Sequence, residues 1–405
     1  MMANSAVDKE LAKGGAISII NLVDSLVDEA ERLRSSDIHI DPQSANIRIR
    51  YRIDGILHNA HTAPKSIHSE IISRIKILAG LRTDEHYAAQ DGRFHLDLKN
   101  GLMLDIRVSI APTYYGENAV LRLLSEKNEN FTLQSLGFSR ENAAKVEAAL
   151  KKPYGMILAT GPTGSGKTTT LYTLLKILNT NEVSIITIED PIEYALDGVQ
   201  QIQVNTRTSL SFANGLGSIL RQDPDIIMVG EIRDAETAGI AVNAALTGHL
   251  MLSSLHTNDA ATTLPRLLDL KVESYLIAST VNIAIGQRLV RRICPACKQA
   301  RKITDSEIKS LQGIIPREML QCQQEFYFGR GCEKCGGTGY RGRIGIYEVL
   351  APDVEIRRAV LVKADASEIR AIAFARGMTA MIEDGFAKAQ AGITTIEEVL
   401  RMLYE

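Results

Sequence analysis

The chain has 405 residues, 45% of them hydrophobic, and a formal net charge of −2. This length predicts two or three domains. The balanced charge argues against bulk attraction to nucleic acid or an anionic membrane, and no apolar run approaches the ~18 residues that span a bilayer. The first residues lack the apolar stretch of a signal peptide. We therefore expect a cytoplasmic protein, in which paired cysteines hold metal more often than they form disulfides.

The first part of the chain has the pattern of a small α+β domain. Residues 15–34 carry apolar residues at helical spacing. Residues 37–54 alternate in short segments, which predicts strands, and Asp54-Gly55 is a pair typical of a tight hairpin turn. From residue 139 onward, strand patterns alternate with helix patterns instead. That order predicts a parallel sheet with crossover helices, and hence an α/β fold for this part.

A phosphate-binding loop stands between a predicted strand and a predicted helix. Residues 161–168 read GPTGSGKT, with the required spacing. The glycines let backbone N–H groups face phosphate oxygens, Lys167 can reach the β and γ phosphates, and the Thr168 hydroxyl can ligate Mg²⁺. A chance match is disfavoured by the fixed positions together with the flanking strand and helix, so ATP and Mg²⁺ are the expected ligands. The predicted binding residues are Gly161, Pro162, Thr163, Gly164, Ser165, Gly166, Lys167, Thr168 and Thr169.

Two acidic clusters follow apolar strands. The segment IITIEDPIEY delivers Glu189, Asp190 and Glu193, and DIIMVGEIRD delivers Glu231 in the manner of a Walker B acid. Hydrolysis needs acids that hold Mg²⁺ and orient water, and ligands bind where parallel strands end. Any one of these acids alone could be a solvated loop charge, but the two clusters together favour a site.

Two histidines bracket the short apolar segment of GHLMLSSLHTND. A single histidine is more often structural than catalytic, but His256 follows a strand and could sense the γ phosphate. His249 precedes the same strand.

Several linked segments, taken in order, resemble the secretion ATPases of type II secretion and type IV pilus assembly. The resemblance covers about residues 16–405 and implies a ring-shaped homo-hexamer that hydrolyses ATP to power filament assembly. It also implies a PAS-like domain followed by a RecA-like ATPase domain, with nucleotide bound between the two. The implied partner is an inner-membrane platform protein, through which the ATPase would be peripherally associated with the membrane. No direct binding of nucleic acid is expected. The segments are SDIHIDP, RIDG, QDGR, DIRVS, GPTGSGKTTT, TIEDPIEY, RQDPDIIMVGEIRD, GHLMLSSLHTN and TGYRGRIGIYEVL.

The resemblance also assigns roles to residues. Glu193 corresponds to the proposed general base and Glu231 to the Walker B acid. The aspartate box that begins TIED contributes Glu189 and Asp190 to the nucleotide site, and the histidine box contributes His249 and His256.

Arginines of the N-terminal domain are implied to reach the phosphates. By motif position these are Arg93 and Arg107, with Arg122 a looser match. A guanidinium placed against the γ-phosphoryl oxygens stabilises the charge of the transition state. The alternative for Arg93 is a salt bridge with Asp91 or Asp97.

The chain departs from the usual family pattern at two places. Where the family usually has an arginine pair and a proline, the chain reads DEHYAAQDGR with His86-Tyr87, and Gly217 replaces a common arginine. These changes put interface strength and regulation in doubt. The family usually carries a further N-terminal domain, so we expect either a truncated form or a naturally short member.

The predicted organisation of the chain has five parts. They are residues 1–125 (PAS-like), 126–138 (linker), 139–290 (ATPase core), 291–345 (four-cysteine module) and 346–405 (helical region).

Two C-x₂-C pairs, Cys294/Cys297 and Cys332/Cys335, are separated by 34 residues. Four thiolates can close a tetrahedral Zn²⁺ site with no position left for water, which indicates structural zinc. A metal-free or redox pair and a nucleic-acid reader are the alternatives. The helix-like residues 305–315 are expected to loop out, and Cys322 is left over as a free thiol.

The cysteine module also bears on the choice among functions. Retraction motors of the family generally lack it, which favours assembly or secretion over a retraction or DNA-uptake motor. A zinc-ribbon nucleic-acid translocase is disfavoured by the balanced charge. A non-hydrolysing regulatory ring is disfavoured by the presence of Lys167, Glu193 and Glu231.

Overall fold

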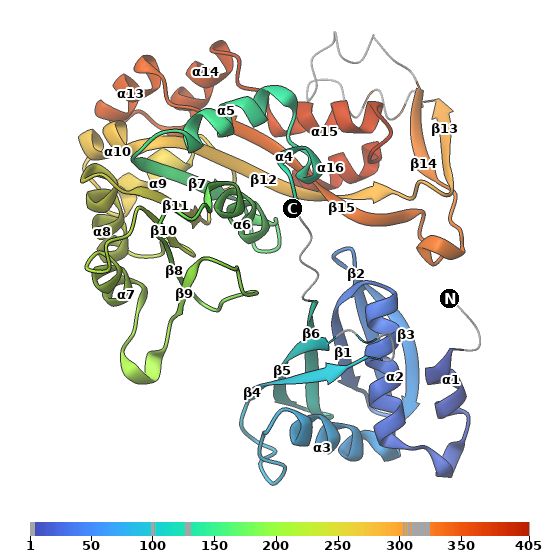
Figure 1. The fold of residues 1–405 in the computed structure, drawn as a ribbon. Coiled ribbons are helices and arrows are strands. Elements are labelled where there is room, and N and C mark those ends of the chain that lie inside the picture. The colour runs from blue at the N-terminus through green and yellow to red at the C-terminus, as the bar shows by residue number, and fades with distance from the viewer. Residues whose placement is uncertain are drawn as a thin grey trace. The chain divides into compact units, whose positions relative to one another are not determined.

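The computed structural model describes residues 5–98, 101, 103–125, 131–302, 304, 306, 309 and 325–404. The chain divides into two compact units, residues 1–129 with 330–341 and residues 130–329 with 342–405. Both units mix helices and strands, so the predicted mixed α/β class is confirmed (Figure 1). Cys322 and most of the helix-like residues 305–315 lie outside the described residues. Among the helices that are described, none combines the length and apolar character needed to cross a membrane.

The first unit contains a six-stranded sheet in the order β3-β2-β1-β6-β5-β4, in which neighbouring strands run antiparallel. Asp54 and Gly55 both have positive φ and join β2 to β3, so the predicted hairpin turn is confirmed. The strands are β1 Ser35–Pro42, β2 Asn46–Ile53, β3 Ile56–Pro64, β4 Gln90–Asp97, β5 Met103–Thr113 and β6 Gly116–Ser125, and the helices are α1 Ala6–Leu11, α2 Ile19–Arg32 and α3 His68–Leu78.

Helix α2 shows how sequence pattern becomes packing in this unit. The Ser18 hydroxyl caps its first turn by accepting a hydrogen bond from the Asn21 amide at 3.4 Å. Its buried residues recur every three or four positions and pack into the core of the sheet. They are Leu22, Val23, Leu26, Val27 and Ala30.

The second unit contains a seven-stranded sheet in the order β15-β12-β7-β11-β10-β8-β9. The neighbouring pairs from β12 to β9 are parallel, as predicted for this part of the chain. Strands β7, β8, β10 and β11 are buried along their whole length, which fits a sheet covered on both faces. The strands are β7 Gly155–Thr160, β8 Ile185–Glu189, β9 Gln200–Gln203, β10 Ile226–Val229, β11 Leu250–Leu255, β12 Val281–Ile293 and β15 Tyr340–Leu350.

The helices of this unit connect and flank the sheet (Figure 1). The predicted helical region at the end of the chain contains α13 to α16, which follow β15. The helices are α4 Leu133–Leu136, α5 Arg140–Leu150, α6 Lys167–Leu178, α7 Phe212–Ile219, α8 Ala235–Leu246, α9 Thr263–Asp269, α10 Ser274–Thr280, α13 Val354–Leu361, α14 Ala366–Ala375, α15 Met381–Gln390 and α16 Ile396–Tyr404.

The segment predicted as a linker, residues 126–138, is only partly described, and its described end packs into the second unit. Leu133, Leu136 and Phe138 are buried in the same core as the strands. The Phe138 ring stacks on Tyr347 of β15 with ring centroids 3.7 Å apart. Because the segment is mostly polar, the packing of these three apolar residues against the sheet could not be predicted from its composition.

The cysteine segment is an excursion from the ATPase sheet. It leaves at the end of β12 and returns through β15, the neighbouring strand in that sheet. Between them, β13 Lys298–Lys302 pairs antiparallel with β14 Glu325–Gly329. The predicted module therefore overlaps two strands of the core, which anchor it at both ends.

Candidate active site and metal centre

The parallel register brings the predicted nucleotide residues to one edge of the sheet. Thr160, which ends β7, lies opposite both Leu255 of β11 and Gly286 of β12. Val229, which ends β10, lies opposite Ser253 of β11. The residues that follow these strands therefore leave the sheet side by side, at the carboxyl edge where ligands bind in such folds.

The phosphate loop follows β7 directly and opens helix α6. Gly161, Gly164 and Gly166 all have positive φ, a conformation that side chains other than glycine rarely adopt. A Cβ on Gly161 would lie 2.5 Å from the Gln287 carbonyl oxygen, so this glycine also allows the phosphate loop to approach the backbone of β12 closely. The loop thus has the bends that direct backbone N–H groups inward.

The Lys167 ammonium group is held by the loop itself. Its Nζ donates to the carbonyl oxygens of Gly161 at 2.8 Å and Pro162 at 3.1 Å. Burial lowers the pKa of Lys167, Glu231 opposes that shift, and Arg288 adds to it. A bound phosphate would offer this ammonium group a full negative charge in place of two neutral carbonyls.

Glu231 lies between two cationic or potentially cationic groups. One carboxylate oxygen accepts a hydrogen bond from Arg233, and the other lies 2.8 Å from Nε2 of His256. Burial would raise the pKa of Glu231, but the hydrogen bonds from Arg233 and His256 outweigh it and the pKa is lowered. An ionised carboxylate next to the phosphate loop is what Mg²⁺ ligation or water orientation requires.

The two predicted histidines lie at opposite edges of the sheet. His256 follows β11 and contacts Glu231, whereas His249 precedes β11. The His249 carbonyl accepts from the Gly155 amide at 3.1 Å, and its Nδ1 lies 3.0 Å from the Ala244 carbonyl. His256 therefore lies at the carboxyl edge of the sheet, where the phosphate loop lies and where ligands gather in such folds. His249 lies at the opposite edge.

The aspartate-box acids differ in exposure. Glu189 ends β8 and is 3% exposed, with hydrogen bonds from Tyr172, Thr187 and Gln201. Asp190 is exposed, and Glu193 is half-buried in the following loop. Glu189 is thus occupied within the protein, which leaves Asp190 and Glu193 as the more accessible acids.

Sequence reasoning missed Gln287, which follows the apolar run of β12. It is fully buried, and its Nε2 donates to the Ser165 carbonyl at 2.8 Å. The only signal in the sequence was its position within β12, just after the apolar residues that begin that strand. Gln287 therefore supports the phosphate loop from the neighbouring strand.

The three arginines predicted in the first unit form a row across its sheet. Arg93 of β4 lies opposite Arg107 of β5, which lies opposite Arg122 of β6. Arg93 donates to both carboxylate oxygens of Asp105, at 2.7 and 2.6 Å, so its salt bridge is with Asp105 and not with Asp91 or Asp97. Arg122 lies 3.1 Å from Asp37.

The row of arginines carries its charge at the surface. The Arg93 and Arg122 side chains are 55% and 61% exposed, and Arg107 is half-buried. Their carboxylate partners Asp105 and Asp37 are only 5% and 4% exposed, so each of these two arginines neutralises a buried charge. Their predicted contact with nucleotide remains a prediction.

The two departures from the family pattern have clear local settings. His86 lies 2.8 Å from one carboxylate oxygen of Glu117, and buried Lys76 lies 2.6 Å from the other. Gly217 is on α7, and a Cβ there would meet no atom within 4 Å. The glycine is therefore not required by packing.

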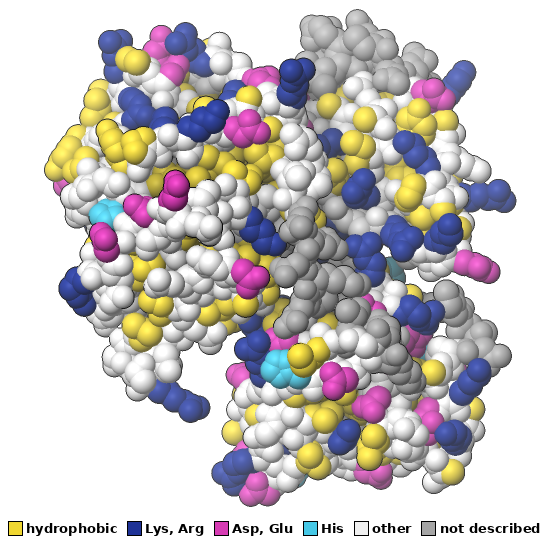
Figure 2. Space-filling model, in the orientation of Figure 1, with side chains coloured by type: hydrophobic (Ala, Val, Ile, Leu, Met, Phe, Trp, Pro, Cys, Tyr) yellow, Lys and Arg dark blue, Asp and Glu magenta, His cyan; other side chains and the backbone are white. Residues whose placement is uncertain are grey.

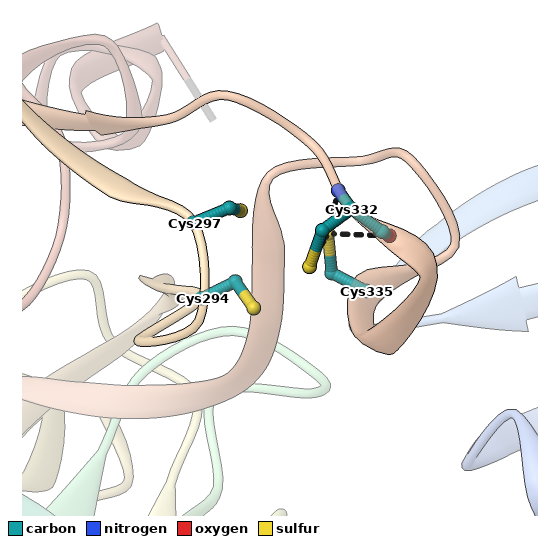
Figure 3. Close-up of side chains that lie close together, drawn as sticks. All are labelled: Cys294, Cys297, Cys332 and Cys335. Atoms are coloured by element: carbon teal, nitrogen blue, oxygen red, sulfur yellow. Dashed lines mark hydrogen bonds between the residues drawn. The ribbon is translucent and has the colours of Figure 1, made fainter.

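The four paired cysteines converge (Figure 3). The Sγ atoms of Cys294, Cys297, Cys332 and Cys335 all lie within 4.8 Å of one another. Lys298 of β13 pairs with Gly329 of β14, so the hairpin closes the gap in sequence between the two pairs. Four sulfurs bound tetrahedrally to zinc at about 2.3 Å lie about 3.8 Å apart, and Cys332 and Cys335 are 3.7 Å apart.

The surroundings of the cysteines also suit a metal. The Cys332 and Gly339 amides lie 3.1 and 3.3 Å from the Cys335 sulfur, as expected of N–H groups that support a thiolate ligand. Figure 2 shows Lys and Arg side chains gathered on this part of the molecule. Exposed cations near the cysteines in sequence include Arg292, Lys298 and Arg343.

Comparisons with known proteins agree with the site. A family model described as "Type II/IV secretion system protein" matches residues 12–401. The chain is 47% identical over 384 residues to "Type II secretion system protein E" of Xanthomonas campestris pv. campestris, covering 95% of this chain and 67% of that protein. It is 43% identical to "Type IV pilus assembly ATPase PilB" of Myxococcus xanthus, covering 94% and 67%. It therefore spans about two thirds of the length of these relatives.

Two solved structures share the fold over most of the chain. The Legionella pneumophila ATPase DotB has a TM-score of 0.68 at 22% identity, covering 94% of this chain and 95% of that one. The pilus retraction motor PilT with bound ADP has a TM-score of 0.61 at 25% identity, covering 94% and 96%. The mixed α/β fold of this chain therefore has RecA-like ATPases among its structural neighbours.

Proposed function

The chain belongs to the type II/IV secretion system protein family and is an ATPase, and we propose that it is the homo-hexameric motor that powers assembly of a type IV pilus or a type II secretion pseudopilus. It would act in the cytoplasm, against an inner-membrane platform protein. The observation that carries this proposal is the register of the parallel sheet, which brings the phosphate loop, Glu231 and His256 to one edge.

Each predicted site residue has a role in the proposed reaction. The loop amides and Lys167 would bind the β and γ phosphates, and Thr168 with Glu231 would hold Mg²⁺. Glu193 would orient and deprotonate the attacking water. Arg93 and Arg107 would neutralise charge on the γ-phosphoryl oxygens, and they belong to a different unit, so hydrolysis would be coupled to domain closure. The first unit is proposed to be PAS-like.

Zinc is the proposed occupant of the four-cysteine cluster. The thiolate set is the one that zinc prefers, and four protein ligands leave no open position for chemistry. A rigid metal site at the base of the β13–β14 hairpin would stiffen this outgrowth of the motor. Its role would be structural, separate from the nucleotide.

The relatives favour assembly over retraction. Those cited above are named for type II secretion and for pilus assembly, while the retraction motor PilT matches at 25% identity. A retraction motor is the second candidate function, carried by that fold match alone.

The decisive experiment combines ATP turnover with filament assembly. Glu193→Gln should abolish phosphate release while Glu182→Gln, which changes an exposed glutamate of the same unit, should not. In a strain lacking its own assembly ATPase, the wild-type chain should restore filaments. Turnover that survives Glu193→Gln would overturn the assigned base. Rescue of a retraction-deficient strain instead would favour the second candidate, and stimulation by nucleic acid would favour a translocase.

A further inference from the structure

A buried polar network links the phosphate-loop helix to the loop that carries Glu193. Its members are Tyr172 on α6, Thr187 and Glu189 on β8, and Gln201 on β9. Tyr172 and Thr187 are 0% exposed and Glu189 is 3% exposed. Burying a carboxylate is costly unless its oxygens are hydrogen-bonded, so the buried Glu189 side chain is expected to accept hydrogen bonds from its neighbours.

The Tyr172 hydroxyl is the centre of this network. It donates to one oxygen of Glu189, and it accepts from the backbone amide of Glu193 at 3.4 Å and from Nε2 of Gln201 at 3.3 Å. The other Glu189 oxygen accepts from Thr187 at 2.6 Å and from Gln201 at 3.1 Å. One hydroxyl therefore joins α6 to the backbone of the Glu193 loop.

Gln201 holds the same loop at two further points. Its Nε2 lies 3.2 Å from the Tyr194 carbonyl oxygen, and its Oε1 accepts from the Leu196 amide at 2.8 Å. The ring of Tyr194 also packs edge-on against that of Tyr172, with centroids 4.8 Å apart. The backbone of residues 193–196 is thus fixed at three atoms by side chains from α6 and β9.

The position of Tyr172 gives these contacts a consequence for the reaction. It lies five residues after Lys167 on the same helix, and the first turn of that helix follows the phosphate loop. A rigid link from this helix to the Glu193 loop fixes the distance between the phosphate-binding residues and the acid that would act on water. Small errors in such positioning lower rates strongly.

We propose that Tyr172, supported by Glu189 and Gln201, is a positioning residue that holds the Glu193 loop in place relative to the phosphate loop. The inference rests on the proposed function, because it takes Glu193 as the group that acts on the attacking water. Glu189 then anchors the tyrosine and has no need to contact nucleotide.

Tyr172→Phe tests this directly, since it removes the hydroxyl and keeps the ring that packs on Tyr194. We expect kcat for ATP to fall about tenfold, the loss typical of a hydrogen bond to a charged group. The affinity for ADP should stay within about twofold, because the phosphate loop is untouched. Amide exchange at residues 193–196 should become faster. A purely structural role would leave the loop's exchange and the ratio of kcat to affinity unchanged.

Tyr347→Phe is the matched control. It also removes a buried tyrosine hydroxyl of the second unit, one that donates to the Leu136 carbonyl at 3.2 Å. A kcat for Tyr172→Phe equal to that of the control, or an equal loss of ADP affinity and kcat, would overturn the inference. Wild-type turnover in Glu193→Gln would overturn the proposed base instead, while faster exchange at residues 193–196 in Tyr172→Phe would still show the anchoring.

Discussion

The Nζ atom of Lys167 lies 2.8 Å from the carbonyl oxygen of Gly161, the first residue of the phosphate loop. The ammonium group of Lys167 therefore bonds to carbonyl oxygens of its own loop. Nucleotide binding exchanges these neutral acceptors for anionic ones, which are stronger partners for an ammonium group.

Removing that ammonium group should therefore remove nucleotide binding and not only catalysis. Lys167→Ala is expected to weaken ADP affinity by about 100-fold, since it loses a charge-assisted contact in a partly buried site. Fluorescence titration with a labelled ADP would measure it. Lys151→Ala, which changes an exposed lysine after α5, is the control and should bind normally. Unaltered affinity in Lys167→Ala would contradict the phosphate-loop assignment.

The pairing of Glu231 with His256 and Arg233 leads to a different expectation. Glu231→Gln keeps the shape of the side chain but removes the charge that Mg²⁺ needs. We expect kcat to fall by about 100-fold or more, with ADP affinity measured without Mg²⁺ little changed. Steady-state phosphate release with and without Mg²⁺ would show this. Glu236→Gln, in the exposed first turn of α8, should behave as wild type; equal losses in both variants would refute the role of Glu231.

The parts of the site that follow local rules could be predicted from sequence. The glycines around Lys167 and the spacing of the four cysteines depend on a few adjacent residues, so they could be identified without a structure. Arg93 shows where this fails. Its partner Asp105 is a diagonal neighbour across the β4–β5 hairpin, and such pairs depend on strand register.

Tyr172 and His249 show two further limits of predicting a site from sequence. Tyr172 reads as an ordinary core residue of a helix, and its network depends on how α6 packs beside β8, which no local pattern encodes. His249 precedes its strand, so its place at the edge of the sheet opposite the phosphate loop could have been predicted from the sequence, since ligands in parallel sheets gather where strands end. The packing of the end of the predicted linker into the core could not be predicted, because polar residues surround Leu133 and Phe138 in the sequence.

The four-cysteine cluster predicts one metal ion per chain. Protein purified without chelator should contain about one zinc per chain by mass spectrometry, and Cys297→Ser should lose it. The free energy of metal binding stabilises the folded hairpin, so the variant should also unfold at a temperature lower by about 5 °C. Cys322→Ser, which changes the fifth cysteine, outside the two C-x₂-C pairs, should keep its zinc. Metal-free wild-type protein would refute the zinc assignment.

The His61 side chain is buried between two acids of the first unit. Its Nδ1 lies 2.8 Å from Asp8 of α1, and its Nε2 lies 2.8 Å from Glu29 of α2. Tyr51 of β2 packs edge-on against its ring. Burial would lower the pKa of His61, but the hydrogen bonds and charges of Glu29 and Asp8 outweigh it, and the pKa is raised.

Because both ring nitrogens face carboxylates, the protonated ring satisfies both and the neutral ring only one. The folded pKa lies above the unfolded value of about 6.5. The stabilisation is therefore complete below pH 6.5 and is lost as the pH rises through the folded pKa. We expect protection factors of the α1 amides, corrected for intrinsic exchange, to fall as the pH rises above about 6.5. His61→Gln should remove this dependence and His58→Gln, on the same strand, should keep it. An equally steep fall in His61→Gln would show that another group controls the docking of α1.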